Sequence, residues 1–264
     1  MIYFDKNIED IRQRKAFICD MDGVIYHGNE IIDGVKDFVN WLKKEKKEFL
    51  FLTNNSGKSP KELSVKLGRM GLKVDETHFY TSAQATARFL SVQAPGCSAF
   101  VIGEPYLYNA LYEAGISLND YDPDYVVIGE TFNYNLDAMC KAMRLVEKGA
   151  KLIGTNSDLT YPNEQGNVPA CRALVSPVEL TTGAQAYYVG KPNPLMMRAA
   201  MHMMGVNSKE TVMIGDRMDT DIIAGIESGM MSVLVLSGVS TLDNIKKFPY
   251  RPTFILDKVG DIAE

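Results

Sequence analysis

Short, almost continuous hydrophobic runs alternate along this chain with amphipathic stretches. The runs cover residues 15–20, 48–55, 211–216, 231–238 and 253–257. Runs of this kind are typical of strands that are covered on both faces of a sheet. The stretches between them, such as residues 34–47 and 60–72, have apolar side chains at helical spacing. The alternation predicts an α/β fold with a doubly wound parallel sheet, Rossmann-like in outline.

The middle of the chain has its own set of strand candidates, interleaved with helical segments. They cover residues 98–104, 124–130 and 150–156. The tetrapeptide VIGE occurs at 101–104 and again at 127–130, but two copies are too few for a repeat fold. We therefore predict an inserted α/β domain over residues 83–187, within a core formed by residues 1–82 and 188–264.

Composition and charge narrow the class of protein. With 264 residues and 46% hydrophobic content, the chain can bury a full core. Its net charge of -5 and the lack of a long basic block argue against nucleic-acid and membrane partners. The first fifteen residues carry charges where a signal peptide would need an apolar centre, so we expect a cytoplasmic protein. The four cysteines form no CxxC pair and are expected to be buried thiols.

Polar side chains follow three of the predicted strands directly. In an open parallel sheet the carboxyl ends of the strands share one crevice, so residues distant in sequence are expected to converge there. In "GKPNP", Lys191 adds a cation shortly before the third of these strands. The strand-end residues are Asp20 and Asp22 after the first strand, Thr53 and Asn54 after the second, and Asp216 and Asp221 after the third.

The carboxylates at these ends require a cation. Two unit charges about 4 Å apart repel by roughly 4 kcal/mol at an effective dielectric constant near 20. Oxygen ligands from Asp20, Asp22 and Asp216 suit a hard ion such as Mg²⁺, which is commonly shared with a substrate phosphate. A carboxylate can also be a nucleophile, and its i+2 neighbour can transfer a proton. Gly23 would permit the tight turn that exposes both groups.

The motifs "DMDGV", "TNN", "GKPNP" and "GDRMDTDI" resemble, in order and spacing, the four motifs of the haloacid dehalogenase superfamily of phosphohydrolases. The resemblance implies a magnesium-dependent phosphatase that proceeds through an aspartyl-phosphate. The roles that it implies are Asp20 as nucleophile, Asp22 as general acid and base, Thr53, Asn54 and Lys191 as phosphate ligands, Asp216 as a metal ligand, and Asp221 as an outer-shell partner.

The position of the insertion narrows the subfamily. Residues 21–52 leave room for a helix but not for a domain, whereas residues 54–190 are long enough for one. This arrangement resembles the NagD-like and p-nitrophenylphosphatase-like group, class IIA with a type 2 cap. The resemblance implies a cap that selects small phosphomonoesters, among them nucleoside monophosphates, sugar phosphates and phosphoglycolate, and it leaves open a homodimer formed through the cap.

Two functions of other classes fit the sequence less well than a phosphatase does. A phosphorylation switch similar to a receiver domain also uses an aspartate with a downstream Thr and Lys, but it needs no inserted domain. A pseudoenzyme that binds phosphometabolites is disfavoured by the complete set of Asp20, Asp22, Lys191 and Asp216. The cap sequence departs from the group pattern at Cys171 and Arg172, where small residues are usual, and Arg172 either contacts an anionic substrate or is a surface residue.

Overall fold

The chain divides into two compact units. The computed structural model describes residues 7–163 and 166–264. Among these, unit 1 contains the residues up to Thr53, Pro60–Tyr80 and Pro194–Glu264, and unit 2 contains Asn54–Ser59 and Thr81–Asn193. Compared with the predicted boundaries, the segments 54–59, 81–82 and 188–193 fall in unit 2, where Asn54 and Lys191 are joined by hydrogen bonds.

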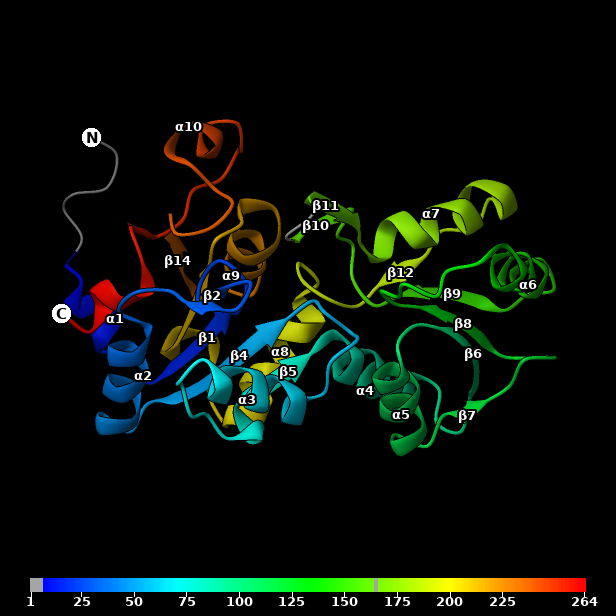
Figure 1. Ribbon diagram of the computed structural model, residues 1–264, viewed down its shortest axis with the longest axis horizontal. Helices are drawn as coiled ribbons and strands as arrows, with labels where there is room; N and C mark the ends of the chain where they lie inside the picture. The colour runs from blue at the N-terminus through cyan, green and yellow to red at the C-terminus, as the bar shows by residue number, and fades with distance from the viewer. Residues whose placement is uncertain (1–6, 164–165) are drawn as a thin grey trace. The chain divides into compact units, whose positions relative to one another are not determined.

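Unit 1 is built on a sheet whose strands lie in the order β15-β14-β13-β1-β4-β5. Strand β1 lies between β4 and β13 and pairs in parallel with both (Figure 1). Strand β4 comes soon after β1 in the sequence, whereas β13 comes much later. The parallel pairing continues through β14 to β15. The predicted doubly wound α/β core is confirmed. The strands are β1 (Ala16–Asp20), β4 (Glu48–Thr53), β5 (Phe79–Thr81), β13 (Thr211–Gly215), β14 (Met231–Val235) and β15 (Phe254–Leu256).

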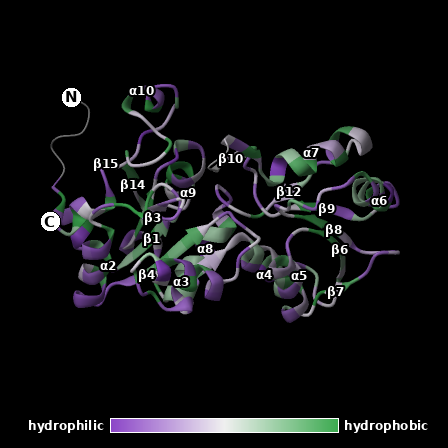
Figure 2. Cartoon of the chain, viewed as in Figure 1, coloured by the Kyte–Doolittle hydropathy of each residue, from purple (hydrophilic) through white to green (hydrophobic). Residues whose placement is uncertain are grey.

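Both faces of this sheet are buried, as the continuous hydrophobic runs indicate. Successive side chains of a strand point to opposite faces. Phe17 and Cys19 pack in one core cluster with residues of helices α2 (Val35–Lys44) and α3 (Pro60–Arg69). Ile18, between them, is fully buried on the other face. Helix α2 has hydrophobic residues toward the core and hydrophilic residues outside, so both colours alternate along it in Figure 2.

The opposite side of unit 1 carries two further helices. Helix α8 (Pro194–Met204) packs against β4, and α9 (Ile223–Glu227) packs against β13 and β14. Helix α9 continues directly from a π-helical turn, η3 (Met218–Ile222), which follows β13. The chain after β13 thus turns immediately into helix, and this turn contains the acidic residues of the fourth motif.

Unit 2 has a second parallel sheet, with the strand order β12-β9-β8-β6-β7. The interior strands β6, β8 and β9 fall where the sequence predicts them. Val126 and Ile128 of β8 pack in one cluster with apolar residues of helices α6 and α7. The elements are β6 (Ser98–Ile102), β7 (Ser117–Leu118), β8 (Tyr125–Ile128), β9 (Lys151–Gly154), β12 (Tyr187–Tyr188), α4 (Ser82–Gln93), α5 (Pro105–Glu113), α6 (Leu136–Glu147) and α7 (Cys171–Thr182).

The remaining elements are short. Strands β2 and β3 pair antiparallel, and so do β10 and β11. The short elements are α1 (Glu9–Arg12), β2 (Tyr26–His27), β3 (Glu30–Ile31), η1 (Glu76–His78), β10 (Thr160–Asn163), β11 (Gly166–Pro169), η2 (Ser208–Glu210), α10 (Leu242–Ile245) and η4 (Val259–Ile262).

No helix of the described residues combines the length and the hydrophobicity that a membrane span requires.

Candidate active site

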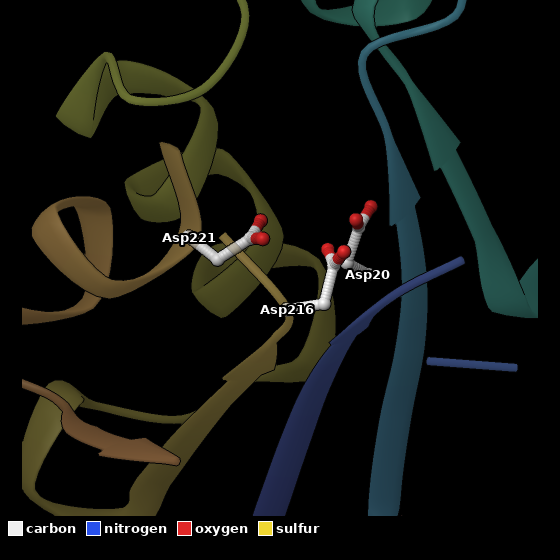
Figure 3. A group of neighbouring side chains, drawn as sticks. All are labelled: Asp20, Asp216 and Asp221. Carbon is white, nitrogen blue, oxygen red and sulfur yellow. The ribbon is translucent and has the colours of Figure 1, made fainter. Parts of the chain in front are cut away.

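Three carboxylates gather at the carboxyl edge of the unit 1 sheet. Asp20 is the last residue of β1, and Asp216 directly follows β13, the parallel neighbour of β1. Asp221 comes from the turn η3. One carboxylate oxygen from each residue lies within 4.8 Å of the others. Figure 3 shows the side chains turned toward a common space. The convergence expected for strand ends is therefore observed for Asp20 and Asp216.

Backbone contacts hold these carboxylates in place. The amide of Val239 donates a hydrogen bond to Oδ2 of Asp216 at 2.7 Å, and the amide of Arg217 donates to Oδ2 of Asp221 at 3.1 Å. Gly23 has a φ of +78°, and a Cβ at this position would lie 2.5 Å from Oδ2 of Asp216. The turn after β1 therefore requires glycine both for its left-handed conformation and for its close approach to the acidic group.

Burial makes the repulsion among the three carboxylates stronger than it would be at a surface. Asp216 and Asp221 are 2% and 0% exposed, and Asp20 is nearly buried. Two unit charges about 4 Å apart repel by roughly 4 kcal/mol at an effective dielectric constant of 20, and by more where water is excluded. A cation removes this repulsion. An all-oxygen donor set of carboxylates suits a hard divalent ion rather than a soft one, so the residues present fit such an ion.

Among the described residues, Asp22 is not a member of this acidic group. Its members, with carboxylate oxygens within 4.8 Å of one another, are Asp20, Asp216 and Asp221. The sequence predicts Asp22 as the third carboxylate ligand of the metal ion, and in the structure Asp221 has that position. The Asp22 side chain is exposed, and the hydroxyl of Tyr26 donates a hydrogen bond to its Oδ2 at 3.0 Å. Burial, followed by the charge of Asp22, raises the pKa of Tyr26, so its hydroxyl remains a donor.

Thr53 ends β4, the other neighbour of β1. Leu52, the residue before it, is the register partner of Asp20. The Thr53 side chain is buried. Within unit 1, the ends of three adjacent parallel strands thus carry Thr53, Asp20 and Asp216 at the same edge of the sheet.

Asn54 and Lys191 are joined to each other in unit 2. Oδ1 of Asn54 accepts from the amide of Lys191 at 2.8 Å, and Nδ2 of Asn54 donates to the Lys191 carbonyl at 3.0 Å. Lys191 is 2% exposed, and the peptide bond to Pro192 is cis. Two residues from separate predicted motifs are therefore in direct contact.

Arg172 is exposed in the first turn of α7. Its guanidinium carbon lies 5.9 Å from the centre of the Tyr188 ring, which is a cation–π arrangement. The neighbouring Cys171 is buried, and burial raises the pKa of its thiol to about 12. All four cysteines are free thiols, of which Cys19, Cys97 and Cys171 are buried, as expected, and Cys140 is half-buried.

The sequence reasoning missed Glu130, a buried acid at the end of β8. Its oxygens accept hydrogen bonds from Ser56 and Asn156, all within unit 2. The repeated VIGE tetrapeptide was the available signal, because Glu130 ends the second copy. The copies alone do not distinguish Glu130 from Glu104, which ends the first.

Models of protein families match both ends of the chain. The model described as "Haloacid dehalogenase-like hydrolase" matches residues 17–117, and a HAD-hydrolase-like model matches residues 188–262. Together these matches cover more than half of the chain and include all four motifs. The chain belongs to the haloacid dehalogenase superfamily.

Characterised relatives narrow this assignment. Dihydroxyacetone phosphatase of Corynebacterium glutamicum is 43% identical over 249 residues, which are 94% of this chain and 90% of the relative. Ribonucleotide monophosphatase NagD of Escherichia coli K12 is 42% identical over 248 residues, 94% of this chain and 98% of NagD. The chain is thus a NagD-like phosphatase, a phosphoric monoester hydrolase.

A solved structure agrees with this assignment. The 4-nitrophenylphosphatase of Thermotoga maritima superposes with a TM-score of 0.93 at 31% identity, covering 98% of each chain. The superfamily and subfamily resemblance inferred from the motifs is confirmed.

Proposed function

We propose that this phosphatase hydrolyses small phosphomonoesters with the help of Mg²⁺ and through an aspartyl-phosphate on Asp20. The observation that carries the proposal is the approach of Asp20 to Asp216 and Asp221, whose oxygens lie within 4.8 Å of one another. An aspartate that is both a strand-end nucleophile and a member of a cation-binding group can hold its reactive oxygen next to a neutralised phosphate.

Asp20, Asp216 and Asp221 would hold the metal ion. When bound, Mg²⁺ supplies positive charge that neutralises the phosphate dianion and its developing charge. The donor set is the support for this choice, because hard carboxylate oxygens are the ligands that Mg²⁺ prefers. The sequence reasoning also counted Asp22 as a ligand. Because its carboxylate lies outside the group, we assign Asp22 proton transfer instead of direct metal binding.

The reaction then has two steps. In the first, an oxygen of Asp20 forms a bond to phosphorus in line with the leaving alcohol, the ester P–O bond breaks, and protonated Asp22 gives its proton to the alcohol oxygen. In the second, Asp22 takes a proton from water, the water oxygen attacks phosphorus, and the Asp20 carboxylate leaves as inorganic phosphate forms. The exposed position of Asp22 and the hydrogen bond that its carboxylate accepts from Tyr26 are compatible with this exchange of protons.

Thr53, Asn54 and Lys191 are proposed to hold the phosphoryl group. Two features support this role. Thr53 is the last residue of β4, the strand next to that of Asp20, and Asn54, the next residue along the chain, is bound to the main chain of Lys191. The Lys191 charge would neutralise phosphate oxygens, and hydroxyl and amide groups would orient them.

The names of the relatives support small phosphomonoesters as the substrate class. Their names specify dihydroxyacetone phosphate, ribonucleoside monophosphates and 4-nitrophenyl phosphate, all small monoesters. Unit 2 is proposed to be the cap that selects among such esters. Arg172 is a surface residue in this proposal, because its charge already lies over the Tyr188 ring.

Release of inorganic phosphate from 4-nitrophenyl phosphate, with Mg²⁺ and with EDTA, tests the proposal directly. A screen of about a hundred phosphorylated metabolites by kcat/KM then ranks the substrates, with values for efficient enzymes on the order of 10⁴ M⁻¹s⁻¹ or higher. Equal phosphate release with Mg²⁺ and with EDTA would exclude the metal-assisted reaction. Absence of turnover on every ester would favour the binding pseudoenzyme.

A further inference from the structure

Glu130 carries a buried carboxylate that the reaction steps do not use. It follows strand β8 and is 8% exposed. Its Oε2 accepts hydrogen bonds from the Ser56 amide at 3.0 Å and from the Ser56 hydroxyl at 2.8 Å, and its Oε1 accepts from Nδ2 of Asn156. Burial raises the pKa of Glu130, and the hydrogen bonds oppose that rise. Both oxygens of this carboxylate are therefore committed to holding neighbouring chain segments.

The segments held by Glu130 are those that carry the proposed phosphate ligands. Asn156, which donates to Glu130, also donates to the main-chain carbonyl of Asn54 at 2.7 Å. Asn54 in turn binds the amide and the carbonyl of Lys191. A continuous chain of hydrogen bonds thus runs from Glu130 to Lys191 through Asn156 and Asn54, while Ser56 fixes the same segment two residues later.

The packing around this chain of hydrogen bonds leaves little room for movement. A Cβ added at Gly190 would lie 2.6 Å from Oδ1 of Asn54 and 2.8 Å from Cβ of Asn156. Nδ2 of Asn54 also donates to Oδ2 of Asp158 at 2.9 Å. Removing one member leaves buried donors without their acceptors, so the segment must shift to satisfy them.

We propose that Glu130 is a positioning residue of the phosphatase, which fixes Asn54 and Lys191 for phosphate binding by anchoring Ser56 and Asn156. The inference rests on the proposed roles of Asn54 and Lys191. A displacement of about 1 Å in a group that orients the substrate can reduce the rate about 100-fold, even when the substituted residue does not touch the substrate.

The chain offers a matched control at the opposite end of the same strand. Asp124 precedes β8, and its Oδ2 accepts hydrogen bonds from the Ser98 amide at 2.8 Å and from the Ser98 hydroxyl at 2.9 Å. The acid-to-serine motif is the same as that of Glu130 with Ser56. Asp124 holds the start of β6 through Ser98, and the hydrogen-bond chain that links Asn54 to Lys191 does not include it.

The test compares the wild type with Glu130→Ala, Glu130→Gln and Asp124→Ala. We expect kcat/KM for 4-nitrophenyl phosphate to fall about 100-fold in Glu130→Ala, chiefly through kcat, and about 10-fold in Glu130→Gln, which keeps one oxygen acceptor. Asp124→Ala is expected to stay within about twofold of the wild type. Amide hydrogen exchange, read by mass spectrometry, should become faster at residues 54–56 and 188–193 in Glu130→Ala alone.

Each outcome decides for or against the role of Glu130. Wild-type kinetics in Glu130→Ala, or an equal loss in Asp124→Ala, would overturn it. If the wild type releases no phosphate, the proposed function fails, while unchanged hydrogen exchange at residues 54–56 and 188–193 would separately overturn positioning. Should Glu130→Ala not fold, Ser56→Ala removes a single donor, and it should lower kcat/KM about 10-fold with the same exchange pattern.

Discussion

The two sheets of this phosphatase use the acids at their strand ends in opposite ways. In unit 1, the carboxylates of Asp20, Asp216 and Asp221 crowd together, with oxygens within 4.8 Å of one another. In unit 2, Glu130 is surrounded by donors from Ser56 and Asn156. Crowded like charges favour the binding of a cation, whereas a carboxylate that accepts from neutral donors can fix the segments that carry them. We therefore propose that the surroundings of an acid decide between chemistry and positioning.

The largest effect is expected for Asp20→Asn. An amide is a poor nucleophile, so kcat should fall by a factor of about 10⁴ or more while the protein stays folded. Phosphate release measures the fall in kcat, and the far-ultraviolet circular dichroism spectrum shows whether the protein stays folded. Asp219→Asn is the matched control, because Asp219 is paired with Arg217 in the fourth motif and is half exposed; it should retain wild-type rates. Wild-type turnover in Asp20→Asn would refute the assignment of Asp20 as the nucleophile.

Removal of the metal ion should have the next largest effect and should separate the two kinds of acid. Chelation is expected to lower turnover by at least about 10³-fold, because the phosphate charge is no longer neutralised. It should also lower Tm, since an ion at about 100 times its Kd stabilises the folded state by about 2.7 kcal/mol. Differential scanning calorimetry with and without Mg²⁺ measures this shift.

Substitutions in each unit sharpen the metal experiment. Asp221→Asn should lose most of the Mg²⁺-dependent rise in Tm, and without metal it should unfold at a higher temperature than the wild type, because one of three repelling charges is gone. Glu130→Gln should keep the full Mg²⁺-dependent rise. An equal metal response in both variants would show that the group around Asp20 does not bind the ion.

Asp22→Asn should have a smaller effect than loss of the nucleophile. Removing a general acid and base typically lowers a rate by about 10² to 10⁴-fold, and here both steps slow because Asp22 acts in each. Activated esters such as 4-nitrophenyl phosphate need little protonation of the leaving group, so on them the second step should limit and a phosphoenzyme should accumulate. Rapid-quench measurement with a ³²P-labelled ester detects it. Unchanged single-turnover rates would remove the acid-base role.

The core of the fold and most of the acidic group could be predicted from the sequence because they depend on local signals. The runs that became β1, β4 and β13 are long enough to show burial on both faces, and parallel pairing then brings Asp20 and Asp216 to one edge. The short strands β5 and β12 lie outside these runs and are too short for periodicity to reveal, whereas β15, as short as β5, lies within the apolar run 253–257. The cytoplasmic location and the homodimer through the cap stay predictions.

The parts that the sequence could not reveal depend on turn geometry and on distant partners. Asp221 joins Asp216 because a π-helical turn carries it back toward the strand end, whereas Asp22 lies outside their group. Glu104 and Glu130 end identical tetrapeptides, yet Glu104 accepts from the Phe132 amide and Glu130 binds Ser56 and Asn156. Only the tertiary hydrogen bonds distinguish the two.

The smallest expected effect concerns how stability depends on pH. Burial raises the pKa of Glu130 above its ordinary value of 4.5. The folded state therefore binds this proton more strongly than the unfolded state, so Glu130 lowers the stability of the wild type as the pH rises from 4.5 through its raised pKa. Glu130→Gln has no proton to lose. The difference in free energy of unfolding, variant minus wild type, should thus shift in favour of Glu130→Gln as the pH rises across that window.

Urea denaturation at a series of pH values measures this difference. The control is Asp124→Asn, because Asp124 is exposed and its hydrogen bonds lower the pKa of its carboxyl group. For Asp124 the sign is opposite, because the wild type gains stability from that carboxylate above the unfolded pKa and loses it as the pH falls through the lowered one. Parallel pH profiles for the two variants would mean that the acid of unit 2 is not held in the buried, donor-lined setting that separates it from the acids of unit 1.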